Sequence, residues 1–494
     1  MLKILLINPP QKYFSGSENF SLYFPLSLLY IAANIKDICS VQILDFLSRD
    51  FEVNKNTEFT IYGSPIEKIE SELKKYNPDI IGITAPFTAQ AEQVIKISRL
   101  CREIHSQATI IIGGPDASVR YKMFLAQNHG DFCVVGEGEQ TMYKFVKNFE
   151  QKDTLKNIAG LAYRENGLIY YKKREFIENL DMLPPPAYEL IDFKDYLDNE
   201  FLYAGRSRVH KNSISIITSR GCPYACVFCA IKLHMGRKFR AQSPESVIDH
   251  LEFIIKKYGI SNFHFEDDNI SFDKVRFEKI LDKIIQHKLI IKWDTPNGIR
   301  ADSLDYEILK KIKQTGCQEL TISIESGNQK VLDEIIKKST KLERMLEIIK
   351  ICKKLKIRLG AFYVIGFPGE TKENMEQTIN LALKLFKTDN VIPHLLIATP
   401  LPGTELYDLC LNLGLIKEDP SSKDFSTATR THGTALFSTA DFSKEDIKEL
   451  VHTYQQDLKK ASFIYSLKNP LYALNRIIKN PKLLKRILFF RQSS

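Results

Sequence analysis

Short apolar runs alternate with helix-periodic segments along residues 1–150. The apolar runs lie at 3–7, 41–44, 80–83, 109–112 and 132–135. The segments at 26–35, 66–76 and 89–104 repeat their apolar residues with the spacing of an amphipathic helix. This alternation predicts a parallel sheet wrapped by helices, an α/β unit of Rossmann-like or flavodoxin-like type. The first strand is not followed by a Gly-x-Gly-x-x-Gly motif, which argues against a dinucleotide ligand.

The alternation breaks over residues 151–212 and resumes at residue 213. The broken stretch predicts a linker with one short hairpin at 161–171, turned at Asn166-Gly167. Six strand ends then follow one another, at 219–222, 265–269, 297–300, 323–327, 363–370 and 397–400. Six such units over 213–400 predict a partial (β/α)6 barrel of TIM type, whose strand ends converge on one open face. Residues 401–494 are predicted to be mainly helical.

The composition is that of an ordinary globular protein, with 494 residues of which 44% are apolar. The first apolar run is cut at Pro9-Pro10, and no run of about 18 apolar residues follows, so we expect no signal peptide and no membrane span. We therefore expect a cytoplasmic protein with reduced cysteines. The net charge of +9 is spread among acidic residues, which argues against a nucleic-acid partner.

One segment is strongly basic. Residues 468–491 carry seven Lys or Arg and no acidic residue, interleaved with Leu, Ile and Phe. Leucines at helical spacing favour a helix pair packed on the body of the protein. The alternative is a peripheral contact with a membrane surface or an acidic partner.

Three cysteines lie within eight residues, just past the first predicted barrel strand. They are Cys222, Cys226 and Cys229. Three thiolates on a four-iron cluster leave one iron without a protein ligand, and that iron can bind a cofactor. A structural zinc site would need a fourth ligand, for which His234 is the nearby candidate. The remaining cysteines show no close spacing and are expected to be buried.

This cysteine spacing, with Phe228 before the last cysteine, resembles the signature of radical S-adenosylmethionine (SAM) enzymes. The resemblance implies a 4Fe-4S cluster on the three cysteines, whose open iron chelates SAM and cleaves it to a 5′-deoxyadenosyl radical. It further implies that Glu266, Asp267 and Asp268 hold the SAM amino group, that Arg300, Ser323 and Glu325 hold the carboxylate and ribose, and that Phe228, Ile365 and Gly366 contact adenine. Tyr363, on a barrel strand, is a candidate hydrogen-atom donor or substrate contact.

The strand ends of the first domain resemble those of the cobalamin-binding domain that precedes the barrel in one subgroup of radical SAM enzymes. The residues that carry this resemblance are Asn8, Pro9, Pro10, Thr84, Gly113, Gly114, Pro115, Gly136, Glu137, Gly138 and Glu139. The Asp-x-His-x-x-Gly loop of many cobalamin proteins is absent, and His105 and His129 lie away from the strand ends. The resemblance therefore implies cobalamin bound without a histidine ligand from the protein.

The subgroup implies methylation of an unactivated carbon of a small-molecule or lipid substrate, through methylcobalamin and the 5′-deoxyadenosyl radical. It also implies an electron donor such as flavodoxin or ferredoxin, and a 401–494 region that caps the barrel mouth. Three alternatives remain open. The first is radical cyclisation, ring rearrangement or oxidation without methyl transfer, and the second is an iron–sulfur electron carrier or binding protein. The third, a tRNA methylthiotransferase, is disfavoured because Asn8, not Cys, follows the first strand.

Overall fold

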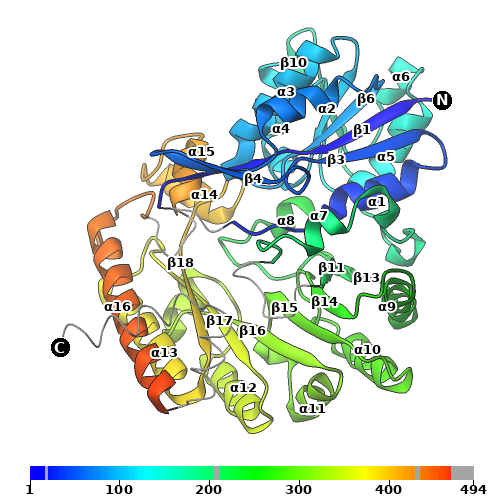
Figure 1. The fold of residues 1–494 in the computed structure, drawn as a ribbon. Helices are drawn as coiled ribbons and strands as arrows, with labels where there is room; N and C mark the ends of the chain where they lie inside the picture. The colour runs from blue at the N-terminus through cyan, green and yellow to red at the C-terminus, as the bar shows by residue number, and fades with distance from the viewer. Residues whose placement is uncertain (17–19, 204–211, 429–433, 469–494) are drawn as a thin grey trace, which may run out of the picture.

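The computed structural model of the chain describes residues 1–16, 20–203, 212–428 and 434–468. Two large β-sheets dominate it, one in each half of the chain. In Figure 1 the first half of the chain lies above the second, and the C-terminal helices lie beside both.

The first sheet has seven strands in the order β10-β9-β8-β7-β6-β1-β3. Its five parallel strands are β1 (Lys3–Asn8), β3 (Ser40–Asp45), β6 (Ile80–Thr84), β7 (Thr109–Gly113) and β8 (Phe132–Val134). Both faces are covered, by α1 (Leu26–Ile35) and α5 (Gly138–Lys147) on one side and by α2 (Ile66–Leu73), α3 (Ala91–Ile104) and α4 (Pro115–Ala126) on the other. Strand β1 is apolar throughout for this reason: Ile4 and Leu6 belong to the first cluster of core residues, and Leu5 and Ile7 to the second. The predicted Rossmann-like sheet is confirmed.

Two parts of the first half differ from the expectation. The hairpin of β9 (Leu161–Glu165) and β10 (Leu168–Tyr171) extends the first sheet next to β8, so it is part of that sheet. A three-stranded antiparallel sheet of β2 (Gln11–Phe14), β5 (Phe59–Gly63) and β4 (Glu52–Lys55) was not predicted, because the exposed β4 has no apolar alternation. The domain boundaries at 150, 212 and 400 stay predictions.

The second sheet has six parallel strands in sequence order. They are β11 (Ile214–Ile216), β14 (Asn262–Phe265), β15 (Lys292–Ile299), β16 (Cys317–Glu325), β17 (Leu359–Ile365) and β18 (Ile392–Ile397). The helices that alternate with them are α9 (Pro244–Tyr258), α10 (Lys274–Gln286), α11 (Tyr306–Gln314), α12 (Leu342–Lys354) and α13 (Lys372–Asp389). Among the described residues β11 and β18 do not pair with each other, which confirms the predicted partial barrel.

The barrel helices begin and end where local sequence directs. At the start of α9 the Ser243 hydroxyl accepts a hydrogen bond from the Ser246 amide, and Gly259 ends the helix in a left-handed conformation. At the start of α13 Thr371 and Asn374 form a reciprocal capping box, and Asn390 ends it in the same left-handed conformation. The short helix α6 (Lys152–Leu155) precedes β9, and α7 (Lys194–Leu197) lies between the two sheets in sequence.

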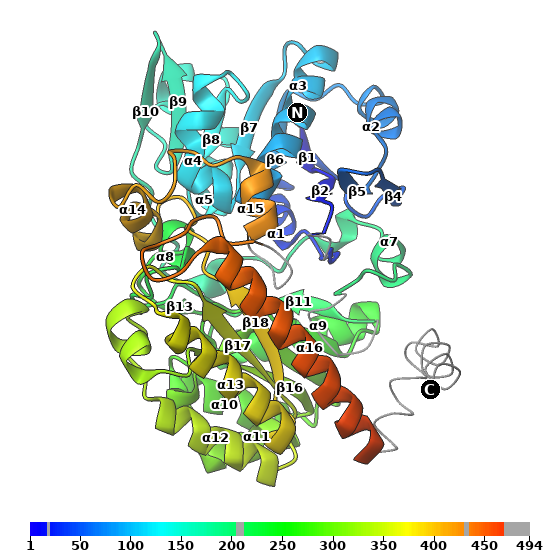
Figure 2. The same ribbon diagram turned by 90° about the vertical axis from the view of Figure 1, so that its left-hand side faces the viewer.

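The C-terminal region contains α14 (Glu405–Asn412), α15 (Ser422–Ala428) and α16 (Lys444–Lys468). Helix α15 contacts β2 and the 3-10 turn η1 (Thr88–Gln90) of the first half, and α16 lies along α13 on the outside of the barrel (Figure 2). No helix within the described ranges is long and apolar enough to cross a membrane. The basic segment 468–491 lies, apart from Lys468, outside the described residues.

Candidate functional site

The three clustered cysteines lie in the loop between β12 (Ser219–Arg220) and α8 (Ile231–His234). Their side chains are partly exposed, whereas the other six cysteines of the chain are buried. The pKa of Cys229 is raised to about 12, mainly by burial and in smaller part by the neighbouring thiols of Cys226 and Cys222. The three thiols therefore share one region, and their chemistry fits three ligands of a 4Fe-4S cluster.

The arrangement gives less support to zinc. Zinc holds its ligands about 2.0–2.3 Å from one ion, so they must converge closely. In the part of the chain that the structure describes, no three His, Cys, Asp or Glu side chains converge enough to hold a single ion. His234, the fourth ligand that a zinc site would need, lines a separate cavity described below.

The acidic segment after β14 supports the cysteine loop from one side. The Asp267 carboxylate accepts hydrogen bonds from the Thr218 hydroxyl at 2.8 Å and the Ser219 hydroxyl at 2.5 Å. Asp268 accepts from the Gly221 amide at 2.8 Å. Both acids are thus engaged with the strand that leads into Cys222, and Asp267 in particular anchors that strand. The expectation that Glu266, Asp267 and Asp268 hold the SAM amino group stays a prediction, and the structure adds this second role for Asp267 and Asp268.

Asn269, which the sequence analysis did not single out, lies next in the segment. Its side chain is buried, its Nδ2 donates to Cys222 Sγ at 3.9 Å, and its Oδ1 has no partner among the described residues. A polar side chain beside a cysteine has no distinct sequence pattern, because only the fold brings the two together.

Arg300 follows β15, and its donors are already engaged. Its guanidinium donates to Asp302 at 2.6 Å and to the carbonyls of Lys338 and Ser339 at 3.1 and 3.2 Å. It also stacks on Tyr224 of the cysteine loop, 3.5 Å from the ring centroid. Arg300 therefore supports this loop, and its expected role as a ligand of the SAM carboxylate stays a prediction.

Glu325, at the end of β16, forms a buried ion pair. Lys338 Nζ donates to Glu325 Oε1 at 3.0 Å, and both side chains are less than a tenth exposed. Glu325 has a left-handed backbone with φ of +66°, and Lys338 lowers the pKa of Cys226 while burial raises it overall. Sequence reasoning missed Lys338, because one lysine in a lysine-rich loop carries no distinguishing signal.

The barrel strands present alternate residues to the interior and to the outer helices. A Cβ added at Gly298 of β15 would lie 2.7 Å from Ser323 Oγ and 3.5 Å from the Phe362 ring, so Ser323 and Phe362 face the interior. Tyr363 is therefore on the outer face, fully buried, where burial and Tyr454 of α16 raise its pKa. The role of Tyr363 as a hydrogen-atom donor or substrate contact stays a prediction, and this placement beside α16 does not favour it.

Two further residues at the end of β17 were expected to contact adenine. Ile365 shares a face with Tyr363, because the two are two residues apart in one strand, and its expected contact with adenine stays a prediction. Gly366 lies just past the strand with φ of +88°, and the Phe228 ring lies 5.8 Å from the Phe367 ring. The strand end therefore reaches the cysteine loop through Phe367.

Glu370 holds this strand end in place. Its Oε2 accepts hydrogen bonds from the Gly366 and Phe367 amides at 2.8 and 2.9 Å, whereas its Oε1 has no partner in the described part of the chain. Burial raises the pKa of Glu370 to about 7, although the two amides lower it. The carboxyl group therefore titrates near neutral pH.

We expect Glu370→Gln to remove a pH dependence from the stability of the barrel. Because its folded pKa is raised, Glu370 contributes stability that is complete below about pH 4.5 and lost as the pH rises through about 7. At 1.36 kcal/mol per unit, the wild type should lose up to about 3 kcal/mol relative to the variant between pH 5 and pH 8. Denaturant unfolding followed by fluorescence of Trp293, the single tryptophan and a buried barrel residue, measures this. If the difference in unfolding free energy between wild type and Glu370→Gln stayed constant from pH 5 to pH 8, the raised pKa of Glu370 would be contradicted.

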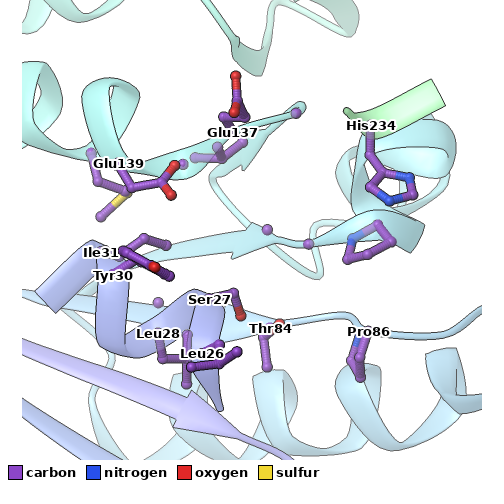
Figure 3. A pocket seen from close by; sticks show the side chains of 18 of the residues that line it. Leu26, Ser27, Leu28, Tyr30, Ile31, Thr84, Pro86, Glu137, Glu139 and His234 are labelled. Carbon is purple, nitrogen blue, oxygen red and sulfur yellow. The ribbon is translucent and has the colours of Figure 1, made fainter. Parts of the chain in front are cut away.

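A cavity of about 320 Å³ lies at the carboxyl ends of the first sheet. Its wall contains most of the residues expected to contact cobalamin: Thr84, Gly113, Gly114, Pro115, Gly136, Glu137, Gly138 and Glu139. In Figure 3 His234 and Pro86 lie at one end of it, across from Tyr30 and Glu139. The loops at the strand ends therefore meet around one space, as the sequence predicts.

Asn8, Pro9 and Pro10 are not on the wall of this cavity. Asn8 instead donates its side-chain amide to Asp45 at 2.8 Å, and both are buried. The end of the first strand is thus occupied by a hydrogen bond to its neighbour β3 before the chain continues into β2. The expectation that these three residues contact cobalamin stays a prediction.

The sequence analysis missed two groups of wall residues. The first is on α1, and comprises Leu26, Ser27, Leu28, Tyr30 and Ile31. The second comes from the barrel and comprises Ile217, Arg220, His234 and Met235, which flank the cysteine loop on both sides. The almost wholly apolar α1 was a usable signal, because such a helix is buried on more than one face. The barrel residues had no such signal.

His234 brings a histidine to the cavity that sequence reasoning did not expect there. Burial lowers the pKa of His234 to about 4, so its imidazole is neutral at pH 7. His105 and His129 lie elsewhere, one bonded to the Leu73 carbonyl and the other to Gln127. The absence of a histidine ligand to cobalamin stays a prediction, and His234 is the residue on which to test it.

The glycine pair at the cavity allows a matched test of backbone strain. Gly114 has φ of +102° and ψ of 179°, a conformation open almost only to glycine, and an added Cβ would lie 2.9 Å from the Ala85 carbonyl oxygen. A Cβ at Gly113 would meet its nearest neighbour at an ordinary 3.6 Å. We expect Gly114→Ala, with about 1–3 kcal/mol of strain, to weaken hydroxocobalamin binding about tenfold or more, and Gly113→Ala to weaken it less. Equilibrium titrations with hydroxocobalamin measure the affinities, and equal losses of affinity in Gly114→Ala and Gly113→Ala would contradict this expectation.

Two family models match the chain. The B12 binding domain matches residues 20–146, and the radical SAM superfamily matches residues 216–382. An uncharacterized methyltransferase, PH0819, from Pyrococcus horikoshii is 31% identical over 418 residues, which is 84% of each chain. Cytidylyl-2-hydroxyethylphosphonate methyltransferase from Streptomyces wedmorensis is 28% identical over 453 residues, covering 85% of this chain and 83% of that protein.

A solved structure shares the fold. The radical SAM methyltransferase TsrM from Kitasatospora setae, with cobalamin and a 4Fe-4S cluster bound, superposes with a TM-score of 0.66 at 16% identity. The match covers 85% of this chain and 80% of that one. Fold and site thus define a protein with a cobalamin-binding domain and a radical SAM barrel. The chain belongs to the radical SAM superfamily, in the group that carries a B12 binding domain. It is an enzyme whose cofactors are a 4Fe-4S cluster, SAM and cobalamin.

Proposed function

We propose that this enzyme methylates an unactivated carbon of a small-molecule or lipid substrate. The observation that carries the proposal is the shared border of the two candidate cofactor sites. Arg220, on the cavity wall, is two residues before Cys222, and His234, also on the wall, is five residues after Cys229. Cofactors held by the cavity and by the cysteine loop would therefore face the same space. Two relatives named as methyltransferases favour methyl transfer over cyclisation, ring rearrangement or oxidation.

The proposed cluster ligands are Cys222, Cys226 and Cys229. They are the three partly exposed thiols of the chain, and the hydrogen bonds of Asp267, Asp268 and the Arg300 stack on Tyr224 brace the loop around them. A braced loop keeps three ligands in place while the fourth iron stays open to SAM.

For SAM we propose side chains at the ends of the barrel strands beside the cysteine loop. Glu266 and the unpaired Asn269 Oδ1 would accept from its amino group, while Ser323 and the ion-paired Glu325 would meet the ribose. The backbone around Phe228 and at Gly366 would pack against adenine. For the SAM carboxylate we add Lys338, a second buried cation near the cysteines, to the predicted Arg300; both also form ion pairs within the protein.

When bound, the cofactors supply a methyl donor and a radical that removes hydrogen from carbon. The work of the chain is to hold the two sites at a constant separation and to exclude water from the space between them. The buried interior-facing residues of the barrel and the apolar wall of the cavity suit the second task.

We propose a cytoplasmic enzyme that receives electrons from a donor such as flavodoxin or ferredoxin. The apolar, exposed Phe463, Ile464 and Leu467 near the end of α16 precede the basic segment 468–491, which supports a peripheral contact with a lipid surface. Such a contact would suit a substrate dissolved in a membrane.

Anaerobic reconstitution with iron, sulfide and hydroxocobalamin, followed by incubation with SAM and reductant, tests the proposal. We expect about four irons and one cobalt per chain, together with both S-adenosylhomocysteine and 5′-deoxyadenosine. 5′-Deoxyadenosine without S-adenosylhomocysteine would favour radical chemistry without methyl transfer. Iron without either product would favour an electron carrier, and four irons without cobalt would contradict the cobalamin half of the proposal.

A further inference from the structure

Two acidic residues of the cavity wall pair with two arginines of the barrel half. Arg220 donates through Nη1 to Glu137 Oε1 and through Nη2 to Glu139 Oε1, each at 2.7 Å. Arg240 Nη1 lies 2.7 Å from Glu137 Oε2. All four side chains are at least nine-tenths buried. The charges balance, so the two carboxylates are engaged by protein and are not free for a ligand.

The bridge of Glu137, Glu139, Arg220 and Arg240 joins two elements that would hold different cofactors. Glu137 and Glu139 flank Gly138 at the start of α5, on the wall of the cavity. Arg220 and Arg240 lie opposite each other in the two-stranded ribbon of β12 and β13 (Arg240–Ala241). Strand β12 runs directly into Cys222, so the bridge fixes the cavity to the start of the cysteine loop.

The segment between the two sheets strengthens the same connection. The Ile177 amide donates to Glu137 Oε2 at 3.0 Å, and the Ile177 carbonyl accepts from Arg240 at 2.8 Å. Phe176 lies against both Arg174 and Arg240, with guanidinium-to-centroid distances of 4.7 and 4.8 Å. Arg174 in turn donates to the Leu233 carbonyl of α8 at 2.6 Å. The predicted linker therefore takes part in the connection.

Buried guanidinium–carboxylate pairs of this kind are directional. An arginine that forks between two carboxylates is held in distance and in angle, and a buried environment keeps water from replacing either contact. A lysine cannot reproduce this geometry, because its ammonium is a single point of charge. The bridge therefore holds the two elements at a defined distance and angle.

We propose that this bridge sets the separation and orientation of the cobalamin cavity and the iron–sulfur loop, with Arg220 as the positioning residue. The inference rests on the proposed function for its purpose, since methyl donor and radical must reach one substrate carbon. A displacement of about 1 Å in such an arrangement can lower the rate about 100-fold. The bridge thus coordinates the two half-reactions without contacting the reacting atoms.

The variant that tests this is Arg220→Met combined with Glu139→Gln. It removes one positive and one negative charge together and leaves the Arg240–Glu137 pair with its Ile177 contact intact, so no carboxylate is left unpaired. The matched control is Arg120→Met, which breaks a buried Arg120–Asp116 pair of 2.8 Å in α4. Its further hydrogen bonds go to Thr88 of η1, so this pair lies within the first half of the chain.

The measurement is the distance between bound cobalt(II) cobalamin and the reduced cluster, from their magnetic interaction in pulsed electron paramagnetic resonance. We expect a narrow distribution in the wild type and in Arg120→Met, and a broader or shifted one in the double variant. In the same samples the ratio of 5′-deoxyadenosine to S-adenosylhomocysteine should rise at least about tenfold in the double variant, because cleavage needs only the cysteine loop. For Arg220→Lys we expect a distance distribution and a product ratio between those of the wild type and those of the double variant.

An unchanged distribution and ratio in a double variant that holds both cofactors would overturn the proposal. An equal change in Arg120→Met would also overturn it, because the effect would then be one of general stability. If the double variant does not retain its cofactors, Glu139→Gln alone removes one arm of the fork and should shift both readouts in the same direction. If Glu139→Gln then had the distance distribution and the product ratio of the wild type, the proposed role of the bridge would be contradicted. Failure of methyl transfer in the wild type would refute the proposed function while the distance measurement still decides the inference.

Discussion

Cys226→Ala should abolish reductive cleavage of SAM. Cys226 is the central member of the three partly exposed thiols, and a cubane that has already one open iron would be left with two protein ligands. We expect the iron content after reconstitution to fall well below four per chain and the rate of 5′-deoxyadenosine formation to fall by about 1,000-fold or more. Iron analysis and chromatographic detection of 5′-deoxyadenosine, with dithionite as the reductant, measure the two effects without a known substrate.

The matched control for Cys226→Ala is Cys352→Ala. Cys352 is fully buried on α12, in the same half of the chain, and its thiol behaves as a small apolar group. We expect its removal to leave iron content and cleavage close to wild type. A Cys226→Ala protein that retained four irons and its cleavage rate would refute the assignment of the cluster to this loop.

Lys338→Met should destabilise the barrel and impair SAM cleavage. It leaves the Glu325 carboxylate buried without its partner, at a residue whose backbone already has a left-handed φ. Breaking a buried ion pair from one side costs about 3–5 kcal/mol. The loss should appear as an earlier midpoint in denaturant unfolding followed by Trp293 fluorescence, because Trp293 lies in the neighbouring strand β15.

A double variant and a neighbouring lysine separate charge from packing. Lys338→Met combined with Glu325→Gln removes both charges and should recover much of the stability, but not SAM cleavage, because both residues are proposed to contact SAM. Lys337→Met changes the adjacent residue, whose ion pair with Glu405 is about half exposed, and should cost less than about 1 kcal/mol. Similar losses for Lys337→Met and Lys338→Met would show that the loop, not the buried pair, sets the stability.

The architecture was predictable because periodicity depends on local sequence. The apolar run at 3–7 predicts a strand covered on both faces, and β1 is buried on both faces. The six strand ends of the barrel were located from short polar and glycine segments, such as 265–269 after β14. The antiparallel β4 was missed, because its residues Glu52–Lys55 are exposed and polar and carry no period.

The candidate site was predictable only where residue type restricts chemistry. Closely spaced cysteines and strand-end glycines have few other uses, so Cys222 and Gly114 stood out. Acidic residues, arginines and tyrosines have many structural uses besides binding a cofactor, so their presence at a strand end says less about a site. Arg300 pairs with Asp302 and Asp267 anchors the strand before Cys222, and neither partner could be inferred from spacing.

The sequence by itself determined the two α/β halves, the order of the barrel strands, and the cysteine and glycine loops, because each depends on residues close together in the chain. The tertiary structure decided which side chains face one another. Tyr363 faces outward because strand geometry alternates, Asn8 bonds to Asp45 across two strands, and Arg220 meets Glu137 only because the two halves dock there. Contacts between distant segments leave no local pattern, so the bridge between the two cofactor sites could be seen only in the folded chain.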